Sequence, residues 1–198
     1  MRGMTAQLAH EERRTLLGPV TVDDWLAADA PADGSRLELI LGYFAMSPPP
    51  TGFHQDVTAE LTGLLRAALR AAGRSDLRGL PGVGVRISTP LRIALIPDLV
   101  VVNVGVRRAT FEADNLLLAV EVWSPGNRRA ERETKIGAYA QAGVPFLWLV
   151  ETPLGEPVKF RGYRLEGVEY VLKVQAEAGE TVTAPGPVPV KIDTSELG

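Results

Sequence analysis

The stretch that decides the fold is LLLAVEVW, residues 116–123, an almost wholly apolar run that contains one carboxylate. A run of this length and composition is typical of a central strand buried on both faces of a sheet. Period-2 alternation places Glu121 on the face of Leu117, Ala119 and Trp123, near the end of the strand, where α/β sheets commonly build their sites. Because an ionised carboxylate is costly to bury alone, the sequence also predicts a compensating partner for Glu121.

The patterns on either side of this strand predict an α/β domain. Further strands are predicted at 83–87, 97–104 and 145–150, with a strand pair inside 36–46 that turns at Gly42 and a hairpin formed by 159–165 and 169–174. Helices are predicted at 21–26, where the helix lies on the surface, from 54 to about 72, and over 128–142. Residues 1–20 form a loose leader, residues 21–198 form a single domain with a mixed central sheet flanked by helices, and the tail at 184–189 lies along an edge.

Composition limits the chemistry that is available. The chain has 198 residues, of which 45% are hydrophobic and 23% charged, so one soluble domain with a sizeable core is expected. Cysteine is absent, which excludes disulfides, thiolate metal sites and cysteine nucleophiles. With two histidines, His10 and His54, a metal bound by three imidazoles is excluded, so a metal would need mainly oxygen ligands, as Mg²⁺, Mn²⁺ or Ca²⁺ do.

Charge and hydropathy bear on partners and location. The formal net charge is −3, which gives no overall attraction to nucleic acid, so binding would need a local basic face. No apolar run approaches the length of a membrane span, and charged residues at 11–14 stand where a signal peptide would be apolar. We therefore expect a cytoplasmic protein with no membrane association.

A second acid, Asp98, follows Pro97 and opens the apolar strand next to the central one. Two carboxylates on adjacent strands repel each other unless a divalent cation lies between them. The alternatives are structural: Glu121 could pair with an arginine in the core, and Asp98 could be a turn residue after a proline.

Lysine usage singles out Lys135. Up to residue 158 the chain has 15 arginines and one lysine, and this lysine lies beside the buried face of the helix that follows the central strand. An ammonium is a compact charge that can reach an anionic oxygen or a water. The alternative is a solvated i, i+4 pair with Glu131.

Taken together, these elements resemble a known family. In order, they read ELILG at 38–42, MSP at 46–48, HQ at 54–55, PDLVVV at 97–102, EVWSP at 121–125, RRAERETK at 128–135, Tyr139, and VPFLWLV at 144–150. This order, over about residues 21–165, is similar to the Uma-type restriction endonuclease family, a domain of unknown function. The family belongs to the PD-(D/E)XK restriction-endonuclease-like nucleases. The chain departs from that signature at Trp123, which stands where the lysine is expected, and has Leu41 and Tyr43 where the family often has acids.

The resemblance implies a restriction-endonuclease-like fold and a set of roles. Asp98, Glu121 and the Val122 carbonyl would bind one Mg²⁺ or Mn²⁺, and Lys135 would replace the strand lysine and orient or help deprotonate the attacking water. Glu38 would complete the metal shell or orient Lys135, with a solvated strand residue as the alternative. His54 would join the site or form hydrogen bonds at its helix end.

The implied activity is that of a metal-dependent endonuclease acting on DNA. A basic face for DNA could come from Arg128, Arg129 and Arg132, with Arg107 and Arg108 after the Asp98 strand and a second row at Arg66, Arg70 and Arg74. For each row, a solvated helix face is the more common explanation. The alternative function is a catalytically inactive nucleic-acid-binding or protein-binding module on the same fold. Because cutting both strands of a duplex usually takes two active sites, a homodimer is a further possibility.

Overall fold

The centre of the fold is a six-stranded mixed sheet around residues 116–123. The computed structural model describes residues 19–124, 129–153, 155 and 157–197. In spatial order the sheet contains β11 (Glu169–Ala176), β10 (Lys159–Glu166), β9 (Phe146–Glu151), β8 (Leu116–Trp123), β6 (Leu99–Val102) and β3 (Arg78–Pro81). Strand β8 pairs antiparallel with β6 and parallel with β9, so the predicted central strand is confirmed.

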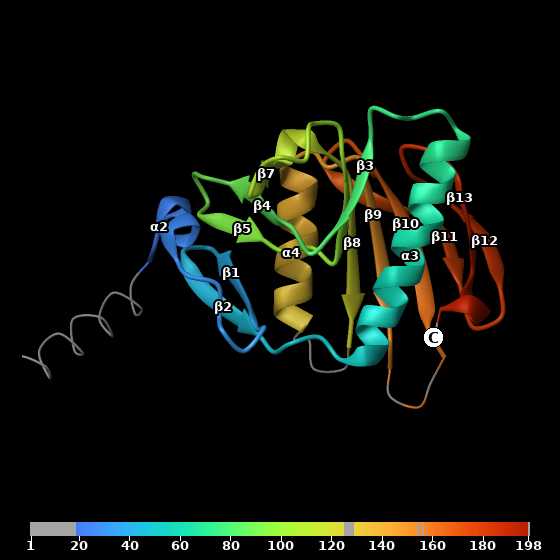
Figure 1. The fold of residues 1–198 in the computed structure, drawn as a ribbon, viewed down its shortest axis with the longest axis horizontal. Helices are drawn as coiled ribbons and strands as arrows, with labels where there is room; N and C mark the ends of the chain where they lie inside the picture. Colours follow the sequence, from blue (N-terminus) through green and yellow to red (C-terminus); the bar gives the residue numbers. More distant parts are fainter. Residues whose placement is uncertain (1–18, 125–128, 154, 156, 198) are drawn as a thin grey trace, which may run out of the picture.

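The parallel pair of β8 and β9 requires a crossover, which α4 (Arg129–Gln141) supplies. One face of the sheet packs against α3 (Gly52–Ala71), and Leu118, Val120 and Val122 belong to that core. The other face packs against α4, with Ala119 and Trp123 in that second core. Figure 1 shows α4 between the strands of two sheets and α3 on the opposite side of β8 in that view. The predicted alternation is confirmed for Ala119 and Trp123. It is wrong for Leu117, which packs against the α3 core, while Leu116 lies in the α4 core, because the pairing of β8 with β6 shifts register at this point.

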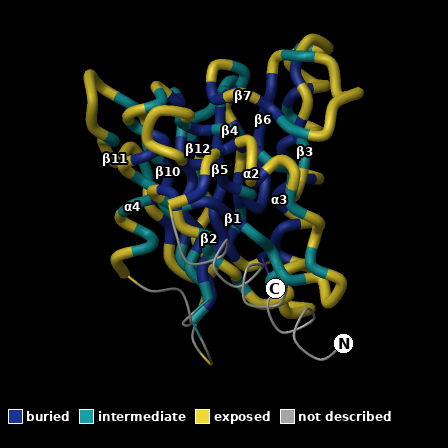
Figure 2. Tube along the Cα trace, turned by 90° about the vertical axis from the view of Figure 1, so that its left-hand side faces the viewer, coloured by how far each residue is buried: buried dark blue, intermediate teal, exposed yellow. Residues whose placement is uncertain are grey.

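A second sheet closes over α4. Its order is β2 (Tyr43–Ser47), β1 (Arg36–Ile40), β5 (Ile93–Leu95), β4 (Gly84–Ser88) and β7 (Thr110–Glu112). Residues of β4, β5 and β7 share a core with α4 and with one face of the central sheet. Figure 2 shows the buried residues gathered in the strands and the exposed ones in the outer turns.

The short helix α2 (Val22–Ala27) lies at the surface as predicted, and one of its faces is buried. Thr21 caps it as predicted, but Val22 and Trp25 are buried, and the Trp25 indole donates a hydrogen bond of 2.7 Å to the Leu37 carbonyl. A Cβ on Gly84 would lie 2.8 Å from the Trp25 ring, so this contact requires glycine. Helix α2 is therefore part of the packing of the second sheet.

The C-terminal segment differs from the prediction. Residues 184–189 do not run along an edge; they join β12 (Thr181–Ala184) to β13 (Val190–Asp193), a two-stranded sheet that shares the α3 core through Val190 and Ile192. The Trp148 indole donates a hydrogen bond of 2.6 Å to the Pro185 carbonyl. Residues 1–18 of the predicted leader lie outside the described residues.

The turn between β1 and β2 generates a prediction about stability. Leu41 and Gly42 have φ angles of 52° and 84°, the combination that a two-residue type I′ turn requires. Leucine is strained at positive φ, and Leu41 is 52% exposed, so no buried contact offsets the strain. Leu41→Asn should raise the free energy of unfolding by on the order of 1 kcal/mol, measured by urea denaturation. Leu172→Asn, an exposed leucine in β11, should give no such gain, and an equal effect of both substitutions would contradict the argument.

Candidate active site

Four separate elements bring charged side chains to one point between the two larger sheets. Glu38 comes from β1, Asp98 precedes β6, Glu121 lies near the end of β8 and Lys135 lies on α4. Their exposed fractions are 1%, 3%, 3% and 7%, in that order. All four line a cavity of about 130 Å³ that is also lined by residues 47–51. The sequence-predicted acids and the lysine therefore converge.

Lys135 is the cation at the centre of this cluster. Its Nζ lies 2.9 Å and 2.8 Å from the two carboxylate oxygens of Glu38 and 3.5 Å from Glu121 Oε2. Burial alone would lower the pKa of Lys135, but the carboxylates of Glu121 and Glu38 outweigh it and raise this pKa above its ordinary value. The solvated pair with Glu131 is not what the structure shows: Lys135 is buried and pairs with Glu38 and Glu121.

Glu38 is held by the backbone as well as by the lysine. Its Oε1 accepts a hydrogen bond of 2.8 Å from the Ile96 amide, two residues before Asp98. The alternative of a solvated strand residue is therefore wrong, because Glu38 is buried and doubly bound.

The negative charge of Glu121 is the least well compensated of the three buried carboxylates. The Tyr139 hydroxyl donates a hydrogen bond of 2.6 Å to Glu121 Oε1, and Lys135 lies on the other oxygen at the longer distance. Burial raises the pKa of Glu121 to about 7, with the charges of Asp98 and Glu38 adding to the effect that Lys135 opposes. The partners of Glu121 are a lysine and a tyrosine, so the alternative of a core arginine pair is not found.

The environment of Asp98, unlike that of Glu121, stabilises the ionised carboxylate. Its Oδ2 accepts a hydrogen bond of 2.7 Å from the Val122 amide, and its Oδ1 contacts the Arg36 guanidinium and, at 3.1 Å, His54 Nε2. Burial would raise the pKa of Asp98, but the His54 hydrogen bond and the Arg36 charge outweigh it, so this pKa is lowered. Asp98 is therefore more than a turn residue, because it joins β6, β8, β1 and α3.

His54 makes contacts both at the start of helix α3 and in the site, the two locations that the sequence predicted for it. Its backbone amide donates to the Thr51 hydroxyl, which caps α3, while its ring reaches Asp98. Val122 is directed to the same side, since its amide points to Asp98. In an extended strand the carbonyl of a residue points the same way as its amide.

Two residues of the site were not predicted. Arg36 lies two positions before Glu38, and residues so spaced share one face of a strand. Tyr139 lies one helical turn after Lys135 and was noticed only as part of a motif. The spacing therefore places Arg36 near Glu38 and Tyr139 near Lys135. It does not show that Arg36 contacts Asp98 or that Tyr139 contacts Glu121.

The donor chemistry fits a hard divalent cation, although no dedicated centre is formed. Within the described residues there is no group of three or more His, Cys, Asp or Glu side chains arranged to hold a metal ion. Two carboxylates and the backbone carbonyl of Val122 are oxygen donors that Mg²⁺ and Mn²⁺ accept together with water and phosphate oxygens. Burial is the main cause of the raised pKa of Glu121, and the charges of Asp98 and Glu38 add to it, so a cation beside these carboxylates would lower this pKa.

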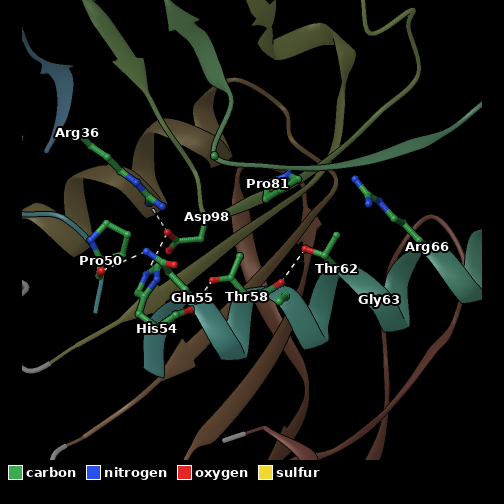
Figure 3. A pocket seen from close by; sticks show the side chains of 12 residues that line it. Arg36, Pro50, His54, Gln55, Thr58, Thr62, Gly63, Arg66, Pro81 and Asp98 are labelled. Carbon is green, nitrogen blue, oxygen red and sulfur yellow. Dashed lines mark hydrogen bonds and ion pairs between the residues drawn. The ribbon is translucent and has the colours of Figure 1, made fainter. Parts of the chain in front are cut away.

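A groove leads away from the cluster. A cavity of about 520 Å³ shares Arg36, His54 and Asp98 with the site and continues along α3 as far as Arg66. Figure 3 shows Arg36 and His54 pointing toward Asp98, while Thr58, Thr62 and Arg66 follow the helix away from it. The buried cluster therefore opens onto an elongated surface.

The arginines predicted as a basic face differ in their contacts and in their position relative to the cluster. Arg128 lies outside the described residues. Arg129 is exposed and pairs with Glu133, whereas Arg132 stacks 4.8 Å from the Trp123 ring centre and donates a hydrogen bond to the Ser124 carbonyl. Arg107 and Arg108 follow β6 at the end opposite Asp98, so they do not extend a face beside the cluster.

Comparison with known proteins assigns the family. The Uma2 family, described as "Putative restriction endonuclease", matches residues 23–195, and the chain belongs to this family. A crystal structure from Anabaena variabilis, described as "a putative nuclease belonging to DUF820", has the same fold. Its TM-score is 0.65 at 17% sequence identity, over 90% of this chain and 97% of that one. No curated protein matches the chain. None of the described helices is long and apolar enough to cross a membrane.

The pKa of Glu121 generates a prediction for the metal-free protein. Because the folded state raises this pKa from 4.5 to about 7, it binds the Glu121 proton more tightly than the unfolded chain does. The resulting stabilisation is complete below pH 4.5 and is lost as the pH rises to 7. Relative to wild type, the free energy of unfolding of Glu121→Gln should therefore rise by about 3 kcal/mol between pH 4.5 and 7.5, measured by urea denaturation in EDTA. Glu131→Gln on α4 serves as the control, and parallel pH profiles for wild type and Glu121→Gln would contradict the prediction.

Proposed function

We propose that this chain is a metal-dependent endonuclease that hydrolyses phosphodiester bonds in DNA. The observation that carries the proposal is the convergence of Asp98, Glu121 and Lys135 from a loop, a strand and a helix into one buried cavity. Membership of the restriction endonuclease family supports a nuclease, and the oxygen donors support Mg²⁺ or Mn²⁺ rather than zinc.

Asp98, Glu121 and the Val122 carbonyl are the residues that would bind the cation. When bound, the cation would supply Lewis-acid stabilisation of the negative charge that develops on the phosphorus centre. Asp98 is ionised throughout the neutral range because its pKa is lowered, and the Val122 amide fixes one of its oxygens. His54 and Arg36 lie on the other oxygen and line the entrance to the groove.

Lys135 acts as a fixed hydrogen-bond donor in this mechanism. Because its pKa is raised, its Nζ carries three protons at neutral pH and is poorly suited to remove a proton from water. Its charge can orient the attacking water through the oxygen lone pair and stabilise a phosphate oxygen. Glu38 positions the ammonium by holding it with both oxygens, so we assign it a positioning role.

Substitution of Lys135 tests this mechanism. Lys135→Ala should lower Mn²⁺-dependent cleavage of plasmid DNA by on the order of 10²-fold, since a preorganised donor of this kind contributes that much. Lys135→Arg should restore little, because a planar guanidinium cannot occupy the site of a point charge between two carboxylates. Circular dichroism melts must show folded variants, and an Asp98→Asn preparation controls for contaminating nuclease. Near wild-type cleavage by Lys135→Ala would exclude the role of Lys135.

Metal binding is tested separately from cleavage. Mn²⁺ should raise the melting temperature of the wild-type protein, because a ligand that binds only the folded state stabilises it by mass action. Glu121→Gln should abolish most of this increase, whereas Glu131→Gln should retain it. An equal Mn²⁺ effect in both variants would place the cation elsewhere.

The second candidate is a catalytically inactive nucleic-acid-binding module. It is favoured by the engagement of Asp98 Oδ1 by both Arg36 and His54, which leaves this oxygen to be released before it can bind a cation. A protein that binds DNA but shows neither Mn²⁺ stabilisation nor cleavage would support this candidate. A homodimer remains a prediction for either function.

A further inference from the structure

Two grooves on the same side of α3 join at one residue. The groove that begins at Asp98 has a volume of about 520 Å³ and ends at Arg66, and a second groove of about 470 Å³ begins at Arg66 and continues to Arg70 and Arg74. Both are bordered by strand β3 or the turn after it, through Gly79 in one case and Pro81 in the other. They meet at Arg66, whose Nε donates a hydrogen bond to the Gly79 carbonyl between them, and we term the two together the α3 groove.

The helix lines this groove with one stripe of residues at intervals of three and four. Gln55, Thr58, Ala59, Thr62, Gly63 and Arg66 form the first part of the stripe, followed by Leu69, Arg70 and Gly73. Small side chains leave the floor open, and a Cβ on Gly63 would meet no atom within 4 Å. At 1.5 Å per residue, the distance along α3 from Gln55 to Arg70 is about 22 Å.

The charges along the groove are of one sign. Apart from Asp98 at its end, the charged residues that line the two grooves are Arg36, Arg66, Arg70, Arg74 and Arg78. Arg66 is anchored by a hydrogen bond of 3.0 Å from its Nε to the Gly79 carbonyl, and the residue is exposed. Arg74 is partly neutralised by Asp76, so Arg66 and Arg70 are the cations best placed to contact a ligand.

We infer that the α3 groove binds one DNA strand through its phosphates and leads that strand to the Asp98 cavity. Arginine terminal nitrogens match phosphate oxygens, and a basic groove that follows the backbone is a common way to bind single strands. Each groove has the volume of a pocket for a small organic molecule, which suits successive nucleotides of one strand rather than a duplex. The inference rests on the proposed nuclease function for the choice of DNA as the polymer.

The test measures binding without cleavage. A fluorescein-labelled 12-nucleotide oligothymidylate is titrated with the full-length protein in EDTA, by fluorescence anisotropy, between 50 and 200 mM NaCl. For single strands the slope of log K against log salt changes by about 0.7 per phosphate contact, so Arg66→Gln/Arg70→Gln should reduce its magnitude by about 1.4. The control, Arg92→Gln/Arg164→Gln, removes two exposed arginines that line neither groove and should leave the slope unchanged.

One further variant and one competitor complete the binding test. Arg66→Lys retains the charge and should keep the wild-type slope, which separates loss of a phosphate contact from disturbance of the Gly79 anchor. A blunt 12-base-pair duplex should compete at least about tenfold more weakly than the unlabelled strand, as the groove volume implies.

The outcomes distinguish this inference from the proposed function. Absence of binding by the wild-type protein, equal slopes for the groove and control variants, or equal competition by the duplex would overturn the α3 groove as a single-strand site. Groove-dependent binding by a protein that does not cleave DNA would support the inference and refute the nuclease. DNA cleavage that is unchanged by substitution of Arg66 and Arg70 would support the nuclease and refute the inference about the α3 groove.

Discussion

The structure depends on the burial of three carboxylates between two sheets. Glu38, Asp98 and Glu121 come from segments far apart in the sequence, and each would be costly to bury alone. Lys135 and Tyr139 come from α4, and Arg36 comes from β1 beside Glu38, so satisfying the charges requires α4 to pack on β8 and β1 to close over both. The same contacts that define the site therefore fix the relative position of the layers. A variant that removes one charge of this cluster tests folding as well as chemistry.

The cluster also separates two carboxyl groups that the sequence presents as equivalent. Asp98 accepts hydrogen bonds from a backbone amide and His54 beside the Arg36 charge, and its pKa is lowered. Glu121 is buried with a tyrosine and a more distant ammonium, and its pKa is raised to about 7. Environments that move two acids apart in this way assign different protonation to each near neutral pH. Asp98 therefore remains charged near neutral pH, whereas Glu121 titrates in the neutral range.

The elements that a local sequence pattern controls could be predicted from the sequence. The elements and contacts that depend on residues distant in the sequence could not. The central strand, both long helices and the turn at Gly42 follow from apolar periodicity and turn residues, and each is present. Strands β3, β5 and β7 have three or four residues and exist through pairing with strands already in place, so no local pattern marks them. In the site, Asp98 and Glu121 were predicted because a carboxylate in or beside an apolar run is conspicuous, and Lys135 because it is the one lysine among the first 158 residues. Arg36 was missed because an arginine at a strand start is ordinary until its partner is known.

The departure at Trp123 is explained by the position of α4. On the strand, residue 123 lies two places after Glu121, where a lysine could reach the carboxylates directly. Here the Trp123 ring stacks on Arg132, whose terminal nitrogen also donates to the Ser124 carbonyl, so the first turn of α4 is held against the end of β8. Arg132, Lys135 and Tyr139 are spaced three and four residues apart and therefore share one face of the helix. Fixing Arg132 on Trp123 directs that face toward Glu121, so Trp123 helps to place Lys135 beside Glu38 and Glu121.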